Sequence, residues 1–187
     1  MRVAVLAVQG AFLEHENMLK KLGVSVMELR RKQDLEQSFD GLILPGGEST
    51  VQGKLLRELG MYQELKERIH AGLPVLATCA GLILLAEELS NDEKVHFGTL
   101  PVTVRRNAYG RQLGSFYTEE EFKGIGKIPM TLIRAPYIEK VSEETEVLAV
   151  VKEKIVGVRY CNQIGVSFHP ELNAHPGIHK MFLEMLA

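Results

Sequence analysis

Three residues with the chemistry of acyl transfer occur in the order cysteine, histidine, glutamate: Cys79, His169 and Glu171. A cysteine thiolate is a nucleophile, a histidine is a general base near neutral pH, and a carboxylate beside that histidine fixes its tautomer and stabilises the imidazolium. Pro170 biases His169 toward an extended backbone, in which side chains two residues apart project to the same side. The spacing therefore predicts a base, His169, with its orienting carboxylate, Glu171.

Cys79 lies where a strand is expected to turn into a helix. The apolar run Leu73–Thr78 is typical of a buried strand, and residues 80–89 are expected to form a helix. Ala77 and Gly81 are small enough for a sharp turn that leaves the cysteine side chain exposed, and a helix N-terminus favours the thiolate over the thiol. An inert buried cysteine fits the same local pattern, so the nucleophile needs support from elsewhere in the chain.

That support comes from the segment Pro45–Thr50, which follows the strand-like run Gly41–Leu44. Its two glycines free the backbone to turn N–H groups toward an anion. A nucleotide phosphate loop is excluded, because Glu48 occupies a glycine position of that motif and Lys54 is not followed by serine or threonine. A plain turn is the remaining alternative. The place of Pro45–Thr50 at the C-terminal end of a sheet strand favours a binding site over a plain turn, since open α/β folds bind ligands there.

These segments together predict one acyl-transfer site. The backbone N–H groups of Gly47 and Ala80 are the expected oxyanion donors, and they complete a set that already holds a nucleophile, a base and an orienting carboxylate. The combination makes Cys79 the expected nucleophile, although each signal alone is weak.

The elements that must position this site alternate between strands and helices in the first half of the chain, which predicts an α/β fold with a parallel sheet covered on both faces. Short strands in the second half are expected to add antiparallel members, giving a three-layer sandwich with a mixed, mainly parallel central sheet. The expected strands are Arg2–Val8, Val24–Leu29, Gly41–Leu44, Leu73–Thr78, Thr99–Arg105, Met130–Arg134, Glu146–Val151, Ile155–Tyr160 and Gly165–Phe168, and the expected helices are Ala11–Leu22, 51–59, Met61–Ala71, Ala80–Leu89 and Pro176–Leu186.

Composition bounds the class of protein. With 187 residues, 45% of them hydrophobic, the chain 1–187 is expected to form a single domain. A formal charge of −2 without a basic block argues against nucleic acid or an anionic membrane as partner. No apolar stretch approaches the ~20 residues of a membrane span, and the N-terminus starts as a strand and not as a signal peptide, so a cytoplasmic protein is expected. Cys79 and Cys161 are too far apart for a Cys-x-x-Cys pair, which argues against a zinc site or a disulfide framework.

The other ionisable groups give weaker signals. The basic segments Arg105–Gln112 and Ile133–Pro136 are either solvated or bind a carboxylate through the planar fork of arginine. His15, His70 and His96 have no carboxylate neighbour like that of His169. His175 and His179 are four residues apart on the final helix, but a metal needs more ligands, so neither a metal nor a cofactor is expected.

Three of these segments carry a resemblance. Pro45-Gly46-Gly47-Glu48-Ser49-Thr50, Thr78-Cys79-Ala80-Gly81 and Ser167-Phe168-His169-Pro170-Glu171 are similar to the three motifs of the triad (class I) glutamine amidotransferases. Arg105–Gln112, Ile133–Pro136 and the alanine at position 77 resemble more closely the family of glutaminase subunits of pyridoxal 5′-phosphate synthase. The similarity extends from Val3 to the final helix.

The resemblance implies hydrolysis of L-glutamine to L-glutamate and ammonia, with Cys79 as nucleophile, His169 as proton relay and Glu171 as its support. It implies an oxyanion site at Gly47 and Ala80, and transfer of ammonia to a separate synthase subunit that makes pyridoxal 5′-phosphate. It also implies that the glutamine substrate is held by six residues, which are Gly47, Glu48, Ser49, Arg106, Ile133 and Arg134.

Three other functions remain open at this stage. The chain could be a non-catalytic partner module that retains the triad, a cysteine hydrolase of another amide, or the glutaminase subunit of another amidotransferase pathway. Inhibition by free glutamine and rapid labelling of Cys79 by a glutamine-analogue electrophile would separate a glutaminase from the first two.

Overall fold

The structure is a computed structural model that describes residues 1–107 and 114–187. Residues 108–113 are not described, so positions 108–112 of the predicted basic segment Arg105–Gln112 lie outside the described residues.

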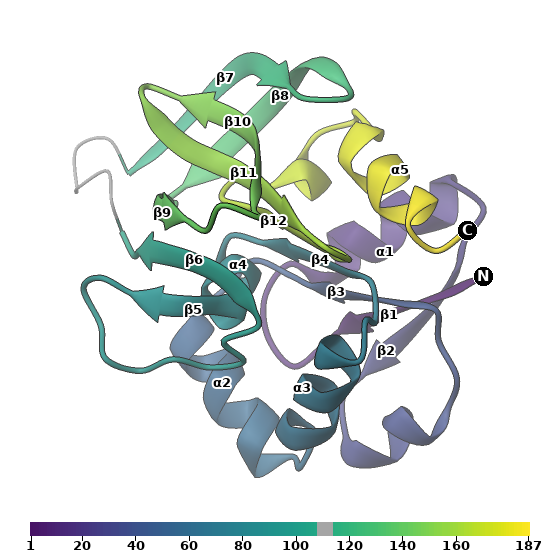
Figure 1. The fold of residues 1–187 in the computed structure, drawn as a ribbon. Coiled ribbons are helices and arrows are strands. Elements are labelled where there is room, and N and C mark those ends of the chain that lie inside the picture. The colour runs from purple at the N-terminus through teal and green to yellow at the C-terminus, as the bar shows by residue number, and fades with distance from the viewer. Residues whose placement is uncertain (108–113) are drawn as a thin grey trace.

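A large mixed sheet forms the centre of the described chain (Figure 1). Its strands run in the order β2-β1-β3-β4-β12-β11-β9-β6-β5, with β10 paired to β11, and β7 and β8 form a separate hairpin. The strands are β1 (Arg2–Leu6), β2 (Ser25–Leu29), β3 (Gly41–Leu44), β4 (Val75–Thr78), β5 (Ala86–Leu89), β6 (Leu100–Arg105), β7 (Ser115–Phe122), β8 (Gly126–Ile133), β9 (Tyr137–Val141), β10 (Glu146–Val151), β11 (Lys154–Tyr160) and β12 (Gln163–Val166).

Helices cover both faces of this sheet (Figure 1). They are α1 (Phe12–Lys21), α2 (Ser49–Glu58), α3 (Tyr62–His70), α4 (Ala80–Leu85) and α5 (Gly177–Glu184), with short 3₁₀ helices η1 (Lys32–Glu36) and η2 (Pro170–Leu172). None of the helices in the described ranges is long and apolar enough to cross a membrane.

Alternation along the central strands divides the core in two. In β1, Ala4 and Leu6 belong to the cluster under α2, α3 and α4, whereas Val3 and Val5 belong to the cluster under α1, α5 and the β7–β8 hairpin. Successive side chains of a strand point to opposite faces, so a strand covered on both sides is apolar throughout. The apolar runs of β1, β3 and β4 have this pattern, with every residue of β3 and β4 buried.

The second half of the chain adds antiparallel strands to the sheet, as predicted, but its last strand, β12, is parallel to β4. Strands β2, β1, β3, β4 and β12 are parallel to one another, and β11 then joins β12 antiparallel. The predicted α/β sandwich with a mixed, mainly parallel sheet is therefore confirmed. Because β3, β4 and β12 are parallel neighbours, their C-terminal ends lie side by side, and the loops that follow them carry the three motif segments.

The sequence interpretation was wrong for the end of one helix and missed three strands, β5, β7 and β9. The helix expected over Ala80–Leu89 ends at Leu85, and Ala86–Leu89 forms β5, which pairs with β6 in parallel. A short apolar run fits a helix or a strand by periodicity alone, and the pairing with β6 decides between them. Strands β7 and β9 were not predicted; the acidic residues Glu119–Glu121 interrupt the apolar alternation in β7.

Candidate active site

Cys79 lies at a sharp turn between β4 and α4. Its backbone has φ 48° and ψ −102°, a left-handed conformation that costs energy for a residue with a side chain. The turn is tight enough to bring α4 against β3, since a Cβ atom added to Gly81 would lie 2.1 Å from the carbonyl oxygen of Leu44. Cys79 as a whole residue is 7% exposed, and its Sγ lies 4.0 Å from the carbonyl oxygen of Ile133. This geometry is that of a nucleophile elbow.

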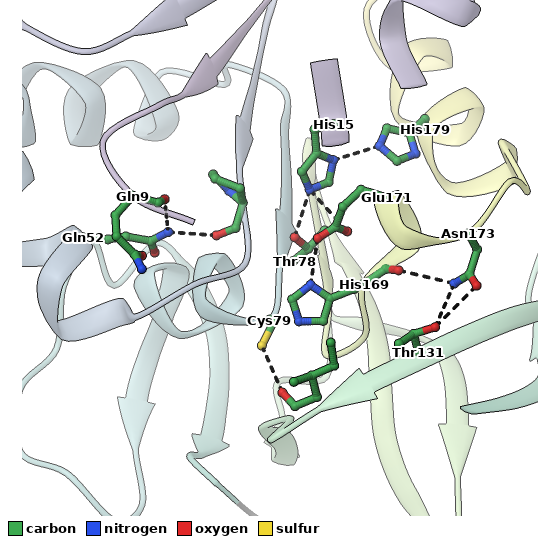
Figure 2. A network of polar contacts seen from close by, with 12 residues as sticks. Gln9, His15, Gln52, Thr78, Cys79, Thr131, His169, Glu171, Asn173 and His179 are labelled. Atoms are coloured by element: carbon green, nitrogen blue, oxygen red, sulfur yellow. Dashed lines mark hydrogen bonds and ion pairs between the residues drawn. The ribbon is translucent and has the colours of Figure 1, made fainter. Parts of the chain in front are cut away.

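His169 and Glu171 form a buried pair beside this turn (Figure 2). The imidazole Nδ1 of His169 is 2.7 Å from Oε1 of Glu171, and the backbone N–H of His169 donates to the carbonyl of Thr131 at 2.8 Å. The extended backbone expected around Pro170 is wrong, because Pro170–Leu172 is a 3₁₀ helix. Pro170 is well placed at the first position of that helix, where it has no N–H to satisfy, and the turn brings the two side chains together.

Charge and hydrogen bonding set the protonation state of this pair. Burial lowers the pKa of His169, but its hydrogen bonds to Cys79 and Glu171 and the charges of both groups raise that pKa to about 10. Burial opposes ionisation of Glu171, but the nearby rings of His15 and His169 and the hydrogen bond from His169 hold the pKa of Glu171 below its ordinary value. The site therefore favours the imidazolium form of His169 beside the ionised carboxylate of Glu171 at neutral pH.

The glycine loop after β3 packs directly against the histidine. A Cβ atom on Gly46 would lie 2.3 Å from Cε1 of His169, so only glycine fits at this position. Gln9 accepts a hydrogen bond from the backbone N–H of Glu48 at 2.8 Å. The side-chain amide of Gln52 donates to the backbone carbonyls of Gln9 and Pro45, each at 3.1 Å (Figure 2). These contacts fix the loop that carries the predicted oxyanion donor Gly47.

A cavity of about 250 Å³ opens in front of Cys79. The cavity brings together the predicted nucleophile, base, oxyanion residues and substrate residues, which come from the C-terminal ends of β3, β4, β6, β8 and β12 and the segments that follow them. Glu171 lies behind His169 and does not line the cavity. The lining residues are Gly47, Glu48, Ser49, Cys79, Ala80, Ile83, Arg106, Asn107, Ile133, Arg134, Pro136 and His169.

Two cationic side chains border the cavity. The guanidinium of Arg106 is held by Asp92 at 2.6 Å and lies 3.4 Å from the hydroxyl of Thr50. Arg134 is exposed, its φ of 45° turns the chain after β8, and its backbone N–H donates to the carbonyl of Gly114. Both positions suit recognition of a carboxylate by a small-molecule site. Among the described residues, no group of three or more His, Cys, Asp or Glu side chains could hold a metal ion.

Comparison with known sequences assigns this chain to a family. The sequence profile described as "SNO glutamine amidotransferase family" matches residues 5–187. The chain belongs to this family of glutamine amidotransferases.

Relatives of this amidotransferase match it over nearly their whole length. The pyridoxal 5′-phosphate synthase subunit PdxT of Desulfitobacterium hafniense (strain Y51) is 69% identical over 187 residues, which cover all of this chain and 94% of the relative. The protein of the same name from Haemophilus influenzae (strain PittEE) is 53% identical, with 99% and 98% covered. A solved structure titled "Crystal structure of glutamine amidotransferase" has a TM-score of 0.93 and 44% identity, with 98% of each chain covered.

The sequence interpretation of the amidotransferase missed several residues at the site. His15 was set aside for want of a carboxylate neighbour, but its Nε2 lies 3.5 Å from Oε2 of Glu171. Gln9 holds the glycine loop, and Ile83, Asn107 and Pro136 line the cavity. No local spacing could have identified His15, because its neighbour is distant in the sequence and the fold alone brings them together.

Proposed function

We propose that this chain is the glutaminase subunit of pyridoxal 5′-phosphate synthase, and that residues 1–187 form one glutaminase domain. It hydrolyses L-glutamine to L-glutamate and ammonia, which a separate synthase subunit consumes. The observation that carries the proposal is the single cavity that holds Cys79, His169 and Arg106 in a member of the glutamine amidotransferase family. The relatives named as synthase subunits, at 69% and 53% identity, support the pathway.

In the proposed reaction the Cys79 thiolate attacks the carbon of the glutamine side-chain amide and forms a carbon–sulfur bond. The backbone N–H groups of Gly47 and Ala80 stabilise the negative oxygen of the tetrahedral intermediate. His169 then gives its proton to the amide nitrogen, ammonia leaves, and a thioester remains on Cys79. His169 next takes a proton from water, the water attacks the thioester, and glutamate leaves as the thiolate re-forms. Glu171 stabilises the imidazolium form of His169 throughout.

The groups around Cys79 suit the charged end of glutamine. The guanidinium groups of Arg106 and Arg134 are matched to the α-carboxylate by their planar forks, and Glu48 is matched to the ammonium group. Gly47, Ser49 and Ile133 complete the proposed contacts and lie on the same cavity.

We also propose that the protein acts in the cytoplasm. Both cysteines of the described chain are free, and a catalytic thiol is kept reduced in that compartment.

The experiment that tests the function is an assay of glutamate release from L-glutamine by the chain mixed with its synthase subunit. Glutamate release that saturates with rising L-glutamine concentration, and that is lost when either protein is left out, supports the proposal. No release of glutamate in the mixture, or equal release from an unrelated amide that glutamine does not inhibit, would contradict it and favour a binding module or another amide hydrolase.

Replacing Arg106 with alanine is expected to raise the KM for glutamine by about tenfold or more, with a smaller change in kcat. A charge-assisted hydrogen bond to the α-carboxylate contributes about 1.5–3 kcal/mol, and it is made equally in the bound substrate and the transition state because the α-carboxylate does not react. Steady-state kinetics of the complex measures both constants. Arg105→Ala is the matched control, because the Arg105 side chain lies near Glu139 on the sheet and not on the cavity. An unchanged KM for the Arg106 variant would reject this role.

A further inference from the structure

A line of buried polar side chains continues beyond Glu171, away from the substrate cavity (Figure 2). Oε2 of Glu171 lies 3.5 Å from Nε2 of His15, and Nδ1 of His15 lies 2.8 Å from Nε2 of His179. The same Nε2 of His15 lies 3.2 Å from the hydroxyl of Thr78, the residue before Cys79. The side chains of His15 and Glu171 are fully buried, and His179 is 0% exposed. The line joins α1, η2, β4 and α5.

The direction of these contacts follows from the carboxylate. An ionised carboxylate only accepts hydrogen bonds, so the His15 tautomer that carries its hydrogen on Nε2, the nitrogen facing Glu171 and Thr78, is the one that does not set two acceptors against each other. The other ring nitrogen of His15 then accepts, and Nε2 of His179 must be its donor. This leaves Nδ1 of His179 without a hydrogen, which agrees with its having no hydrogen-bond partner among the described residues. In this tautomer each hydrogen bond of the line pairs a donor with an acceptor.

The second oxygen of Glu171 depends on this line. Oε2 is buried and makes no hydrogen bond within the described part of the chain, and Nε2 of His15 lies 3.5 Å from it while it is hydrogen-bonded to the hydroxyl of Thr78 at 3.2 Å. The other oxygen, Oε1, is the one bonded to His169. A buried carboxylate oxygen without a nearby donor is costly, and the carboxylate would turn or take up a proton to relieve that cost.

We propose that His15 is a positioning residue for the reaction: its Nε2–H holds Oε2 of Glu171 so that Oε1 faces His169, and His179 fixes the tautomer of His15. The inference rests on the proposed function for its rate measurements. A partner group that fixes a side chain behind a reacting residue is known to affect activity by about 10- to 100-fold in metal sites, and we expect a similar range here.

The charges around His15 agree with a neutral ring. Burial lowers its pKa, while Glu171 and Glu14 act in the opposite direction and His169 adds to the lowering. His179 faces it from α5, and burial together with His15 holds the pKa of His179 well below its ordinary value. A neutral His15 has one N–H to donate, which is what the geometry requires.

Three substitutions at position 15 separate positioning from packing. The amide of glutamine reaches about as far as Nε2 of histidine and can donate to Glu171, whereas the amide of asparagine reaches only as far as Nδ1. In the complex with the synthase subunit, His15→Leu and His15→Asn are expected to lower kcat by about 10- to 100-fold with little change in KM, and His15→Gln is expected to recover most of the rate. His96→Gln is the control, because His96 is another buried histidine with a lowered pKa and lies against Arg57, outside this line.

A second readout does not need glutamine or the synthase subunit. The rate of alkylation of Cys79 by iodoacetamide, measured against pH on the chain alone, reports the thiolate that His169 and Glu171 stabilise. His15→Leu and His15→Asn are expected to need a higher pH for alkylation than the native chain and His15→Gln. If the native chain fails to release glutamate while this order of pH profiles holds, the proposed function fails and the positioning role stands.

Native-like kcat and alkylation profiles for His15→Leu would overturn the inference. So would equal impairment of the Gln, Asn and Leu variants, because that result indicates a packing role. If His15→Leu does not fold, His179→Leu replaces it, since the loss of the donor to His15 is expected to shift the same alkylation profile by a smaller amount, and an unshifted profile would also overturn the inference.

Discussion

Replacing Cys79 with alanine is expected to lower kcat for glutamine hydrolysis by about 10⁴- to 10⁶-fold, because no other group can form the covalent intermediate. The activity that remains would come from binding and the oxyanion donors alone. Glutamate release by the complex measures the loss, and the thermal unfolding midpoint of the variant checks that the fold is retained. The chain supplies its own control in Cys161, an exposed free cysteine.

Cys161→Ala is expected to keep the native rate. A Cys79→Ala variant that folds and works within tenfold of the native chain would remove Cys79 from the mechanism. Loss of activity in both variants would indicate that removing either cysteine damages the protein generally, and would not identify a specific nucleophile.

Replacing Glu171 with glutamine is expected to lower kcat by about 10³- to 10⁴-fold with little change in KM. The amide keeps the shape of the carboxylate but not its charge, so the imidazolium of His169 loses its partner and the ring can adopt the wrong tautomer. The same change is expected to bring the pKa of His169 down from its value of about 10 in the native chain. Nuclear magnetic resonance of the His169 ring across pH 6–11 measures that shift. A kcat within tenfold of native, or an unchanged ring titration, would contradict the assignment.

The same pair makes stability depend on pH with a defined sign. The pKa of His169 is raised from 6.5 to about 10 on folding, so the ionised ring stabilises the fold fully below about pH 6.5, and this contribution is lost as the pH rises toward about 10. Urea unfolding of the native chain and the Glu171→Gln variant should therefore give a stability difference that narrows between pH 6.5 and 10. A difference in unfolding free energy between the two proteins that widens over that range would contradict the raised pKa of His169.

The sequence was most informative where local pattern and burial agree. The strands β1, β3 and β4 are apolar because both of their faces are covered. Gly46, Gly81 and the strained Cys79 lie at tight turns, which the small residues of these segments indicated in the sequence. Parallel neighbours bring the loops after β3, β4 and β12 to one edge, so the order of motifs along the chain was enough to predict a common site.

The remainder depended on contacts that no local pattern records. Ala86–Leu89 became a strand because β6 lies beside it, and Pro170 starts a 3₁₀ helix where its effect on the preceding residue, His169, indicated extended chain. His15 has no acidic neighbour in the sequence, and only the packing of α1 against η2 brings it to Glu171. Long-range packing therefore decides the support behind the predicted triad, whereas the spacing of the motifs was enough to predict the triad itself.

The central claim is that Cys79 attacks glutamine, and covalent labelling tests it most directly. A chloroketone analogue of L-glutamine, incubated with the native chain and its synthase subunit, is expected to add once to Cys79 and to abolish glutamate release, and excess L-glutamine is expected to slow both changes together. Peptide mass spectrometry locates the adduct, with Cys161 as the internal reference. Labelling of Cys161 alone, or complete labelling of Cys79 with glutamate release intact, would contradict the account.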